Sequence, residues 1–396
     1  MSFPLTKNGD SETQFEFATA ARILFGTRAL RQVGPIAAEM GRRALVVTGR
    51  TSARAGPLLD ELAKHGIEYT MFHVLGEPTT TIVREATERA RNADCHLVVG
   101  FGGGSSLDVG KAVAALLTNE GDPEDYLEVV GKGKQLTQPS VPCIAIPTTA
   151  GTGSEVTRNA VLASPSHGIK VSMRSSLMLP RVALVDPEVM YDLPPEITAS
   201  TGLDALTQLI EPYTSGRAST ITDMLCTDGI RRVARSLARA YQDGNNVAAR
   251  EDMALASLFG GLALTNAGLG VVHGFAGPIG GKFSAPHGSI CAVLLPYAME
   301  VNVAAMRLRL PASEALRRYE EIAQTLTDSG TAKASDGVEW VKELCRTLRI
   351  PSLAAYGVRS GDFPELIERA DSASSTKGNP IRLTKDEMLQ MLSRAL

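Results

Sequence analysis

Asp204 and Gln208 stand four residues apart in residues 201–215, whose sequence TGLDALTQLIEPYTS predicts the opening of a helix. Side chains at positions i and i+4 project from one face of a helix, and a carboxylate with such a partner is a common way to hold a metal ion. The usual partner is histidine, because imidazole is a much stronger ligand than a neutral amide. The pair therefore raises two questions: whether the chain binds a metal, and what the glutamine does there.

A glycine-rich turn, GGGSSLD at residues 102–108, ends an apolar run and opens a helical segment. Glycines let backbone N–H groups approach an anion, and a helix N-terminus adds unpaired donors and a favourable dipole. A tight structural turn would also need glycine, and the turn does not match G-x-G-x-x-G. A second such loop, PTTAGTGSE at residues 147–155, follows the next apolar run. Because ligands bind at the C-terminal ends of strands in open α/β sheets, the two loops together predict a nucleotide site.

The composition limits the class of protein. The 396 residues suffice for two domains, with 44% hydrophobic residues, 21% charged residues and a formal net charge of −3. Because no strongly basic surface is indicated, we expect no nucleic-acid partner. No uncharged apolar run reaches the about 18 residues of a membrane span, and residues 1–17 lack the pattern of a secretory signal. We therefore expect a cytoplasmic protein without a membrane partner.

The cysteines contain no C-x-x-C pair and are expected to be buried thiols of a reducing compartment. Nothing in the sequence supports a catalytic cysteine among Cys95, Cys143, Cys226, Cys291 and Cys345.

Apolar runs alternate with helical segments in the first half of the chain, which is typical of a parallel α/β fold. The expected strands lie at residues 44–49, 69–75, 96–104, 141–149 and 182–189. After Leu193 the strand-like runs stop and the segments have helical periodicity. We therefore expect an α/β dinucleotide-binding domain with a Rossmann-like parallel sheet at residues 1–193, and an all-helical metal and substrate domain at residues 194–396.

Four motifs occur in the order GGGSSLDVGK, PTTAGTGSEVT, TGLDALTQLIE and GVVHGFAGPIGGKFSAPHGSICAVLLPY. Together they resemble the iron-containing (group III) alcohol dehydrogenase family, and the resemblance spans nearly the whole chain. It implies a dehydroquinate synthase-like arrangement of two domains with the active site between them. It also implies a divalent iron or zinc ion, NAD or NADP, a small alcohol or aldehyde substrate, and a homodimer.

The resemblance also implies roles for individual residues. The pyrophosphate would rest on Gly103, Gly104 and Ser105, next to Asp108 in the same motif. Further cofactor positions would be Thr148, Thr149 and Lys170. The catalytic and metal positions would be Asp204, Gln208, His273 and His287.

Gln208 is the first of three departures from the family pattern, which usually has histidine there. The remaining two histidines and Asp204 suit ferrous iron or catalytic zinc. Gln208 would ligate through its carbonyl oxygen or leave its position to water, and either would weaken the site. Glu211 does not make up for this loss, because the family usually has it too and it need not be a substitute ligand. A metal-free enzyme in which Gln208 only hydrogen-bonds the substrate is the alternative.

The second departure is Gly277, where the family often has another histidine outside the metal ligands, so we expect a roomier pocket.

The third departure is Gly49-Arg50, where NAD-preferring members commonly have an aspartate that binds the adenosine ribose. Gly49 removes the repulsion of a 2′-phosphate, and Arg50 and Arg54 could pair with it. We therefore expect NADP(H) to be favoured over NAD(H).

The expected reaction is hydride transfer between the nicotinamide and an alcohol, aldehyde or ketone carbon. One alternative is an oxo-acid reductase that resembles maleylacetate reductases, with or without a metal, in which Arg158 and Asn159 would face a polar group. An alternative of another class is a non-catalytic nucleotide-binding relative. The intact cofactor loops and the three remaining ligand positions count against it.

Overall fold

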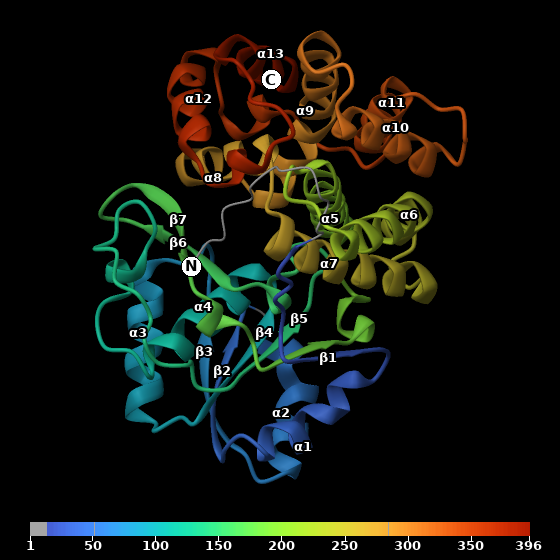
Figure 1. The fold of residues 1–396 in the computed structure, drawn as a ribbon. Helices are drawn as coiled ribbons and strands as arrows, with labels where there is room; N and C mark the ends of the chain where they lie inside the picture. The colour runs from blue at the N-terminus through green and yellow to red at the C-terminus, as the bar shows by residue number, and fades with distance from the viewer. Residues whose placement is uncertain (1–13, 51, 284) are drawn as a thin grey trace.

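The computed structural model describes residues 14–50, 52–283 and 285–396. Figure 1 shows a sheet with helices on both faces in the lower half of the view and a stack of helices above it. The expectation that the chain lacks a secretory signal concerns residues that lie mostly outside the described ones. The expected fold class, a parallel α/β sheet followed by a helical region, is confirmed.

The main sheet has six parallel strands in the order β1-β8-β5-β4-β2-β3. Its strands are β1 (Arg22–Phe25), β2 (Arg43–Thr48), β3 (Glu68–His73), β4 (Leu97–Gly102), β5 (Cys143–Pro147) and β8 (Val182–Val185). Its central strands are apolar on both faces because helices cover both. One face packs against α1 (Val33–Ala38) and α2 (Gly56–Lys64), and the other against α3 (Thr80–Asn92) and α4 (Gly104–Leu116).

Five of the six strands match predicted runs, with ends displaced by a few residues. The sequence patterns missed β1 and an antiparallel hairpin outside the main sheet, β6 (Asn159–Ser164) and β7 (Ile169–Arg174). The run predicted at residues 182–189 is shorter because its strand ends at Val185. There the Asp186 side chain accepts the N–H of Glu188 and starts a short 3-10 helix.

The second half is built from helices around one core. They are α5 (Pro195–Thr214), α6 (Thr220–Gln242), α7 (Val247–Ala267), α8 (Val271–Phe283), α9 (His287–Arg309), α10 (Glu314–Thr327), α11 (Ala334–Thr347), α12 (Phe363–Ser372) and α13 (Lys385–Ala395). The pattern predicts that residues 201–215 open a helix, and this prediction is wrong about the start of the helix. Instead α5 begins at Pro195, because proline is favoured in the first helical turn, where its missing N–H costs no hydrogen bond.

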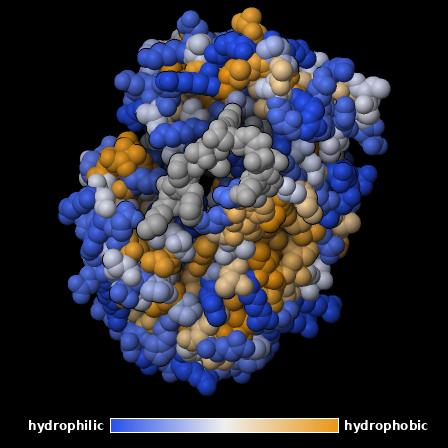
Figure 2. Space-filling model, viewed as in Figure 1, coloured by the Kyte–Doolittle hydropathy of each residue, from blue (hydrophilic) through white to orange (hydrophobic). Residues whose placement is uncertain are grey.

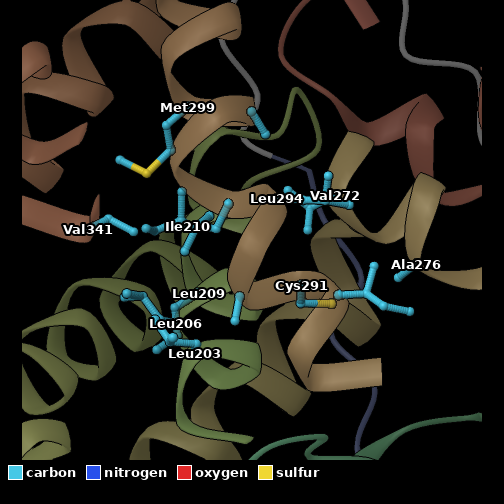
Figure 3. Packing of buried hydrophobic residues seen from close by; sticks show 14 of the residues in the cluster. Leu203, Leu206, Leu209, Ile210, Val272, Ala276, Cys291, Leu294, Met299 and Val341 are labelled. Carbon is cyan, nitrogen blue, oxygen red and sulfur yellow. The ribbon is translucent and has the colours of Figure 1, made fainter. Parts of the chain in front are cut away.

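The core of the helical region continues toward the sheet. Figure 3 shows its side chains from α5, α8, α9 and α11, among them Leu206, Val272 and Cys291. The same cluster includes Ala150 and Ala183 from the first half. The expected division between residues 193 and 194 falls between β8 and α5, where this core is continuous, and it stays a prediction.

Two helical segments are apolar enough to be compared with membrane spans. By length and composition α9 could cross a membrane, and so could α7 and α8 together if their 102° bend is disregarded. However, 83% of the apolar window of α9 is buried inside the protein. Burial in the core accounts for this composition without a membrane.

Candidate metal and nucleotide site

Four side chains from three helices bring donor atoms together. Asp204 comes from α5, His273 from α8, and His287 and Cys291 from α9. One ligand atom from each lies within 4.8 Å of the others. The Nε2 atoms of His273 and His287 are 3.4 and 3.8 Å from Oδ1 of Asp204. Three of the four predicted metal positions therefore meet, and Cys291 joins them although the sequence did not single it out.

The donor set fits a divalent ion. Asp204 is only 1% exposed, and its Oδ1 accepts no hydrogen bond from the described residues. A buried carboxylate oxygen without a hydrogen bond is costly unless a cation or a ligand donor compensates it. Carboxylate, imidazole and thiolate are all ligands of zinc, and carboxylate and imidazole also suit ferrous iron.

Glu211 holds one of the two histidines in place. Its Oε2 lies 2.6 Å from Nδ1 of His273, and its Oε1 accepts the N–H of Val272 at 2.8 Å. A carboxylate at Nδ1 favours the tautomer whose Nε2 carries a lone pair, and this Nε2 faces Asp204. Glu211 is therefore a positioning residue rather than a substitute ligand.

The acidic groups and the two histidines of the cluster shift one another's pKa values. Burial alone would lower the pKa of His273, but the acidic groups of Cys291, Glu211 and Asp204 outweigh it and raise that pKa well above its usual range. Burial lowers the pKa of His287, against the opposing carboxylate of Asp204. Burial would raise the pKa of Asp204, but the two histidines hold it below its usual range. Without a bound cation, the cluster thus holds an ionised carboxylate between a protonated His273 and a neutral His287. A cation at this site would replace the proton on Nε2 of His273.

Gln208 lies one turn after Asp204 and is 3% exposed. Its Oε1 has no hydrogen-bond partner among the described residues. A Cβ atom built on Gly260 of α7 would lie 3.5 Å from that oxygen, so α7 approaches closely there. A buried carbonyl oxygen without a donor is suited to accept a hydrogen bond from a bound molecule.

The two glycine-rich loops touch each other at the C-terminal edge of the sheet. The N–H of Thr148 donates to the carbonyl of Gly102 at 2.9 Å. A Cβ on Gly104 would lie 2.8 Å from Cγ2 of Thr152, so only glycine allows this approach. No side chain of the described residues caps the N-terminus of α4, whose first residue is Gly104. Its free N–H groups therefore form a ready anion site.

Both halves of the chain match one family. Residues 20–187 match the family described as "Iron-containing alcohol dehydrogenase", and residues 198–396 match "Fe-containing alcohol dehydrogenase family, C-terminal". The chain belongs to the iron-containing alcohol dehydrogenase family. The expected enzyme class, an oxidoreductase of the alcohol dehydrogenase type, is thereby confirmed.

Individual relatives agree with this assignment. The 1,3-propanediol dehydrogenase of Citrobacter freundii is 34% identical over 398 residues, covering 97% of this chain and 100% of the relative. A crystal structure of a 1,3-propanediol oxidoreductase superposes with a TM-score of 0.90 at 34% identity, covering 97% of this chain and 100% of that one. The crystal structure of the sulfoacetaldehyde reductase of Bifidobacterium kashiwanohense in complex with NAD+ superposes with a TM-score of 0.85 at 29% identity. The match covers 96% of this chain and 98% of that one.

In this dehydrogenase family member, Gly49 lies at the same sheet edge as the glycine loops, since its Cβ would be 3.8 Å from Oγ of Ser106. Arg50 is exposed, and its Nη2 makes one long bond of 3.4 Å to the carbonyl of Leu75. Arg54 instead pairs with Asp192. Of the two arginines predicted to meet a 2′-phosphate, only Arg50 has no carboxylate partner among the described residues.

Asp108 uses both carboxylate oxygens within the protein. They accept bonds from Oγ of Ser154 at 2.6 Å and from the N–H of Val161 at 2.9 Å, and Nζ of the buried Lys111 lies 3.2 Å away. Asp108 therefore ties α4 to the second loop and to β6. A contact with the cofactor would have to replace one of these bonds, and its predicted cofactor role stays a prediction.

Lys170 lies on the missed hairpin and pairs with Glu77. Strand β7 packs against α8, as Figure 1 also shows. Among the described residues, a Cβ on Gly277 of α8 would have only the carbonyl oxygen of Lys170 within 4 Å, at 3.8 Å. The expected roomier pocket stays a prediction. Lys170, the predicted cofactor residue, therefore lies on a strand that packs against the helix that carries His273.

Sequence reasoning missed Cys291 and the role of Glu211. A signal for Cys291 was available, because it stands four residues after His287 in HGSIC, the spacing of two side chains on one helix face. No comparable signal pointed to Glu211, whose bond to His273 spans 62 positions of the sequence.

Proposed function

We propose that this dehydrogenase transfers a hydride between NADP(H) and the carbonyl carbon of a small aldehyde or ketone, or the corresponding alcohol. The observation that supports it most is the convergence of Asp204, His273 and His287 from three helices, with the unpartnered Oδ1 among them. A bound divalent ion supplies a Lewis acid for the substrate oxygen. We assign the cation to these three residues.

The remaining roles belong to the chain's own side chains. Glu211 keeps His273 in the tautomer that faces the site. The free carbonyl oxygen of Gln208 accepts a hydrogen bond from a substrate hydroxyl. The loop N–H groups at Gly103, Gly104 and Ser105 hold the pyrophosphate, and Thr148 and Thr149 border it. Positioning of hydride donor and acceptor is the protein's main contribution to the rate.

The preference for NADP(H) is supported by charge at the edge of the sheet. Gly49 carries no carboxylate, and the exposed Arg50 has a single weak partner. Guanidinium matches phosphate oxygens well, so a 2′-phosphate would gain a charge-assisted hydrogen bond there.

A homodimer in the cytoplasm completes the proposal. Strand β1 is an edge strand with Ile23 and Phe25 each 37% exposed. Figure 2 shows an apolar area where Figure 1 places β1. An unpaired edge strand with apolar side chains is a natural pairing surface for a second copy. Sedimentation equilibrium of wild type and of Phe25→Lys tests it, and a monomeric wild type would contradict it.

The direct test of the reaction is steady-state kinetics on short aldehydes, ketones, alcohols and oxo-acids with each cofactor. We expect turnover with aldehydes or ketones, a higher kcat/KM with NADPH than with NADH, and loss of activity after chelation that added Zn²⁺ or Fe²⁺ restores. Full activity in EDTA would refute the role of a metal. Tenfold preference for NADH would refute the cofactor assignment.

An oxo-acid substrate is the second candidate. The Nε–H of Arg158 is buried and donates no hydrogen bond to the described residues, while its Nη1 lies 4.0 Å from Oε1 of Glu16. The amide of Asn159 is bonded to Ser172. If Arg158 receives the carboxylate, Arg158→Ala will raise KM for oxo-acids and leave KM for uncharged aldehydes unchanged.

A further inference from the structure

Position 208 has glutamine where a histidine ligand is expected, and Cys291 places a further donor atom in the same cluster. Cys291 is fully buried on α9, and its Sγ lies 3.8 Å from Nε2 of His273 and 3.8 Å from Nε2 of His287. Both nitrogens are the ones that face Asp204. A second, independent feature points to a ligand here, namely the unpartnered and buried Oδ1 of Asp204.

We infer that Cys291 is the fourth protein ligand of the metal, in place of the imidazole that position 208 does not provide, and that the site therefore prefers zinc to iron. This inference rests on the proposed metal site of the dehydrogenase. It adds a ligand that the family pattern does not contain.

The distances between donors agree with one ion. With Zn–N near 2.0 Å and Zn–S near 2.3 Å, the edges of a zinc tetrahedron are about 3.3 Å between nitrogen or oxygen ligands and about 3.5 Å between nitrogen and sulfur. The structure has 3.4 and 3.8 Å for the two oxygen–nitrogen pairs and 3.8 Å for both sulfur–nitrogen pairs. These four distances exceed the tetrahedral edges by only about 0.1 to 0.5 Å, and all donor pairs lie within 4.8 Å of one another.

The fold explains why a cysteine at this position reaches the site. His287 and Cys291 stand four residues apart on α9, so both project from one face. Figure 3 shows the sulfur of Cys291 directed toward the side of the view where Ala276 of α8 lies, away from Leu206 and Leu209 of α5. Helix α9 thus supplies two donors, and α5 and α8 supply one each.

The chemistry of the thiolate sets the choice of metal. Thiolate is a soft ligand that zinc accepts readily, and mixed Cys/His sites are common for zinc. Replacing a family imidazole by an amide and adding a thiolate one turn beyond His287 therefore changes the donor set toward zinc. Gln208 is then free to contact the substrate.

X-ray absorption at the zinc edge of the zinc-loaded wild-type protein tests the ligand without any substitution. We expect one sulfur scatterer at about 2.3 Å beside nitrogen and oxygen scatterers. A first shell of nitrogen and oxygen alone would overturn the inference, and so would failure of the protein to bind zinc.

Variants provide a second measurement. With Co²⁺ in place of zinc, the wild type should show a near-ultraviolet thiolate-to-cobalt charge-transfer band, and Cys291→Ala should lose it. Zinc affinity, measured by competition with a chromophoric chelator, should fall at least about tenfold in Cys291→Ala. Cys226→Ala, which removes another fully buried thiol, is the matched control and should keep the band and the affinity. A band that persists in Cys291→Ala would overturn the assignment.

The outcomes separate this inference from the proposed function. Activity that chelation abolishes, with no zinc–sulfur scatterer, would refute Cys291 as a ligand and leave the metal-assisted reaction standing. A zinc–sulfur scatterer in a protein that turns over equally in EDTA would support the ligand and contradict the metal-assisted reaction. Iron bound at least as tightly as zinc would refute the metal preference.

Discussion

Oε2 of Glu211 lies 2.6 Å from Nδ1 of His273, and both side chains are buried. This contact turns Nε2 of the same ring toward Oδ1 of Asp204, 3.4 Å away. Because the carboxylate also accepts the N–H of Val272 at the start of α8, it fixes the ring and the helix turn that carries it. The orientation of one predicted ligand thus depends on a residue that does not touch the other ligands' donor atoms.

Glu211→Gln should weaken metal binding about 10- to 100-fold, because losing a carboxylate behind a ligating histidine typically has that effect. Chelator competition with zinc measures it. Glu321→Gln is the matched control, since Glu321 also accepts a side-chain bond, from Tyr213, but lies outside the cluster. Equal affinities of wild type and Glu211→Gln would show that the contact does not position the ligand.

Gln208→His should raise metal affinity at least about tenfold, because it adds an imidazole one turn after Asp204. It should also lower kcat/KM for the native substrate, since the amide oxygen proposed to bind that substrate is removed. Gln208→Ala separates the two roles, and we expect its metal affinity to stay within about threefold of wild type if the amide is not a ligand. A rise in both metal occupancy and alcohol oxidation in Gln208→His would instead identify Gln208 as a weakened ligand.

Arg50→Ala should lower kcat/KM for NADPH about 10- to 100-fold and leave the value for NADH nearly unchanged, because one charge-assisted hydrogen bond to the 2′-phosphate is lost. Arg54→Ala is the comparison, since Arg54 is bound to Asp192 and to the carbonyl of Val189. It should not discriminate between the cofactors. A loss that is the same with NADPH and NADH in Arg50→Ala would count against the assignment.

Glu155→Gln should change the pH dependence of stability. Burial raises the pKa of Glu155 from about 4.5 to about 7, and its Oε2 has no hydrogen-bond partner among the described residues. Between these values the folded chain holds a proton that the unfolded chain releases, so the contribution of Glu155 to stability falls as pH rises through this window. The free energy of unfolding of Glu155→Gln, taken relative to that of wild type, should therefore rise by up to about 3 kcal/mol between pH 4.5 and pH 8.

Urea unfolding at both pH values measures this effect. Glu39→Gln, at an exposed position, should show no such difference between the two values. Parallel stability curves for wild type and Glu155→Gln would show that the buried carboxyl does not titrate in this range.

The sequence by itself determined the alternation of strands and helices and the glycine loops, and its resemblance to the family indicated three of the clustered donors. Burial on both sheet faces produces continuous apolar runs, and close backbone approach requires glycine, so both leave local signals. Edge strand β1 and the hairpin β6–β7 left weaker signals, because short or half-buried strands lack such runs.

Only the tertiary structure decided which residues complete the site. Cys291 meets His273 because α8 and α9 pack at the level of Asp204, and Glu211 meets His273 across 62 sequence positions. Contacts of this kind depend on how helices far apart in the chain are placed in space. Local patterns of hydrophobicity and spacing, which reach only along one helix or strand, do not contain that placement.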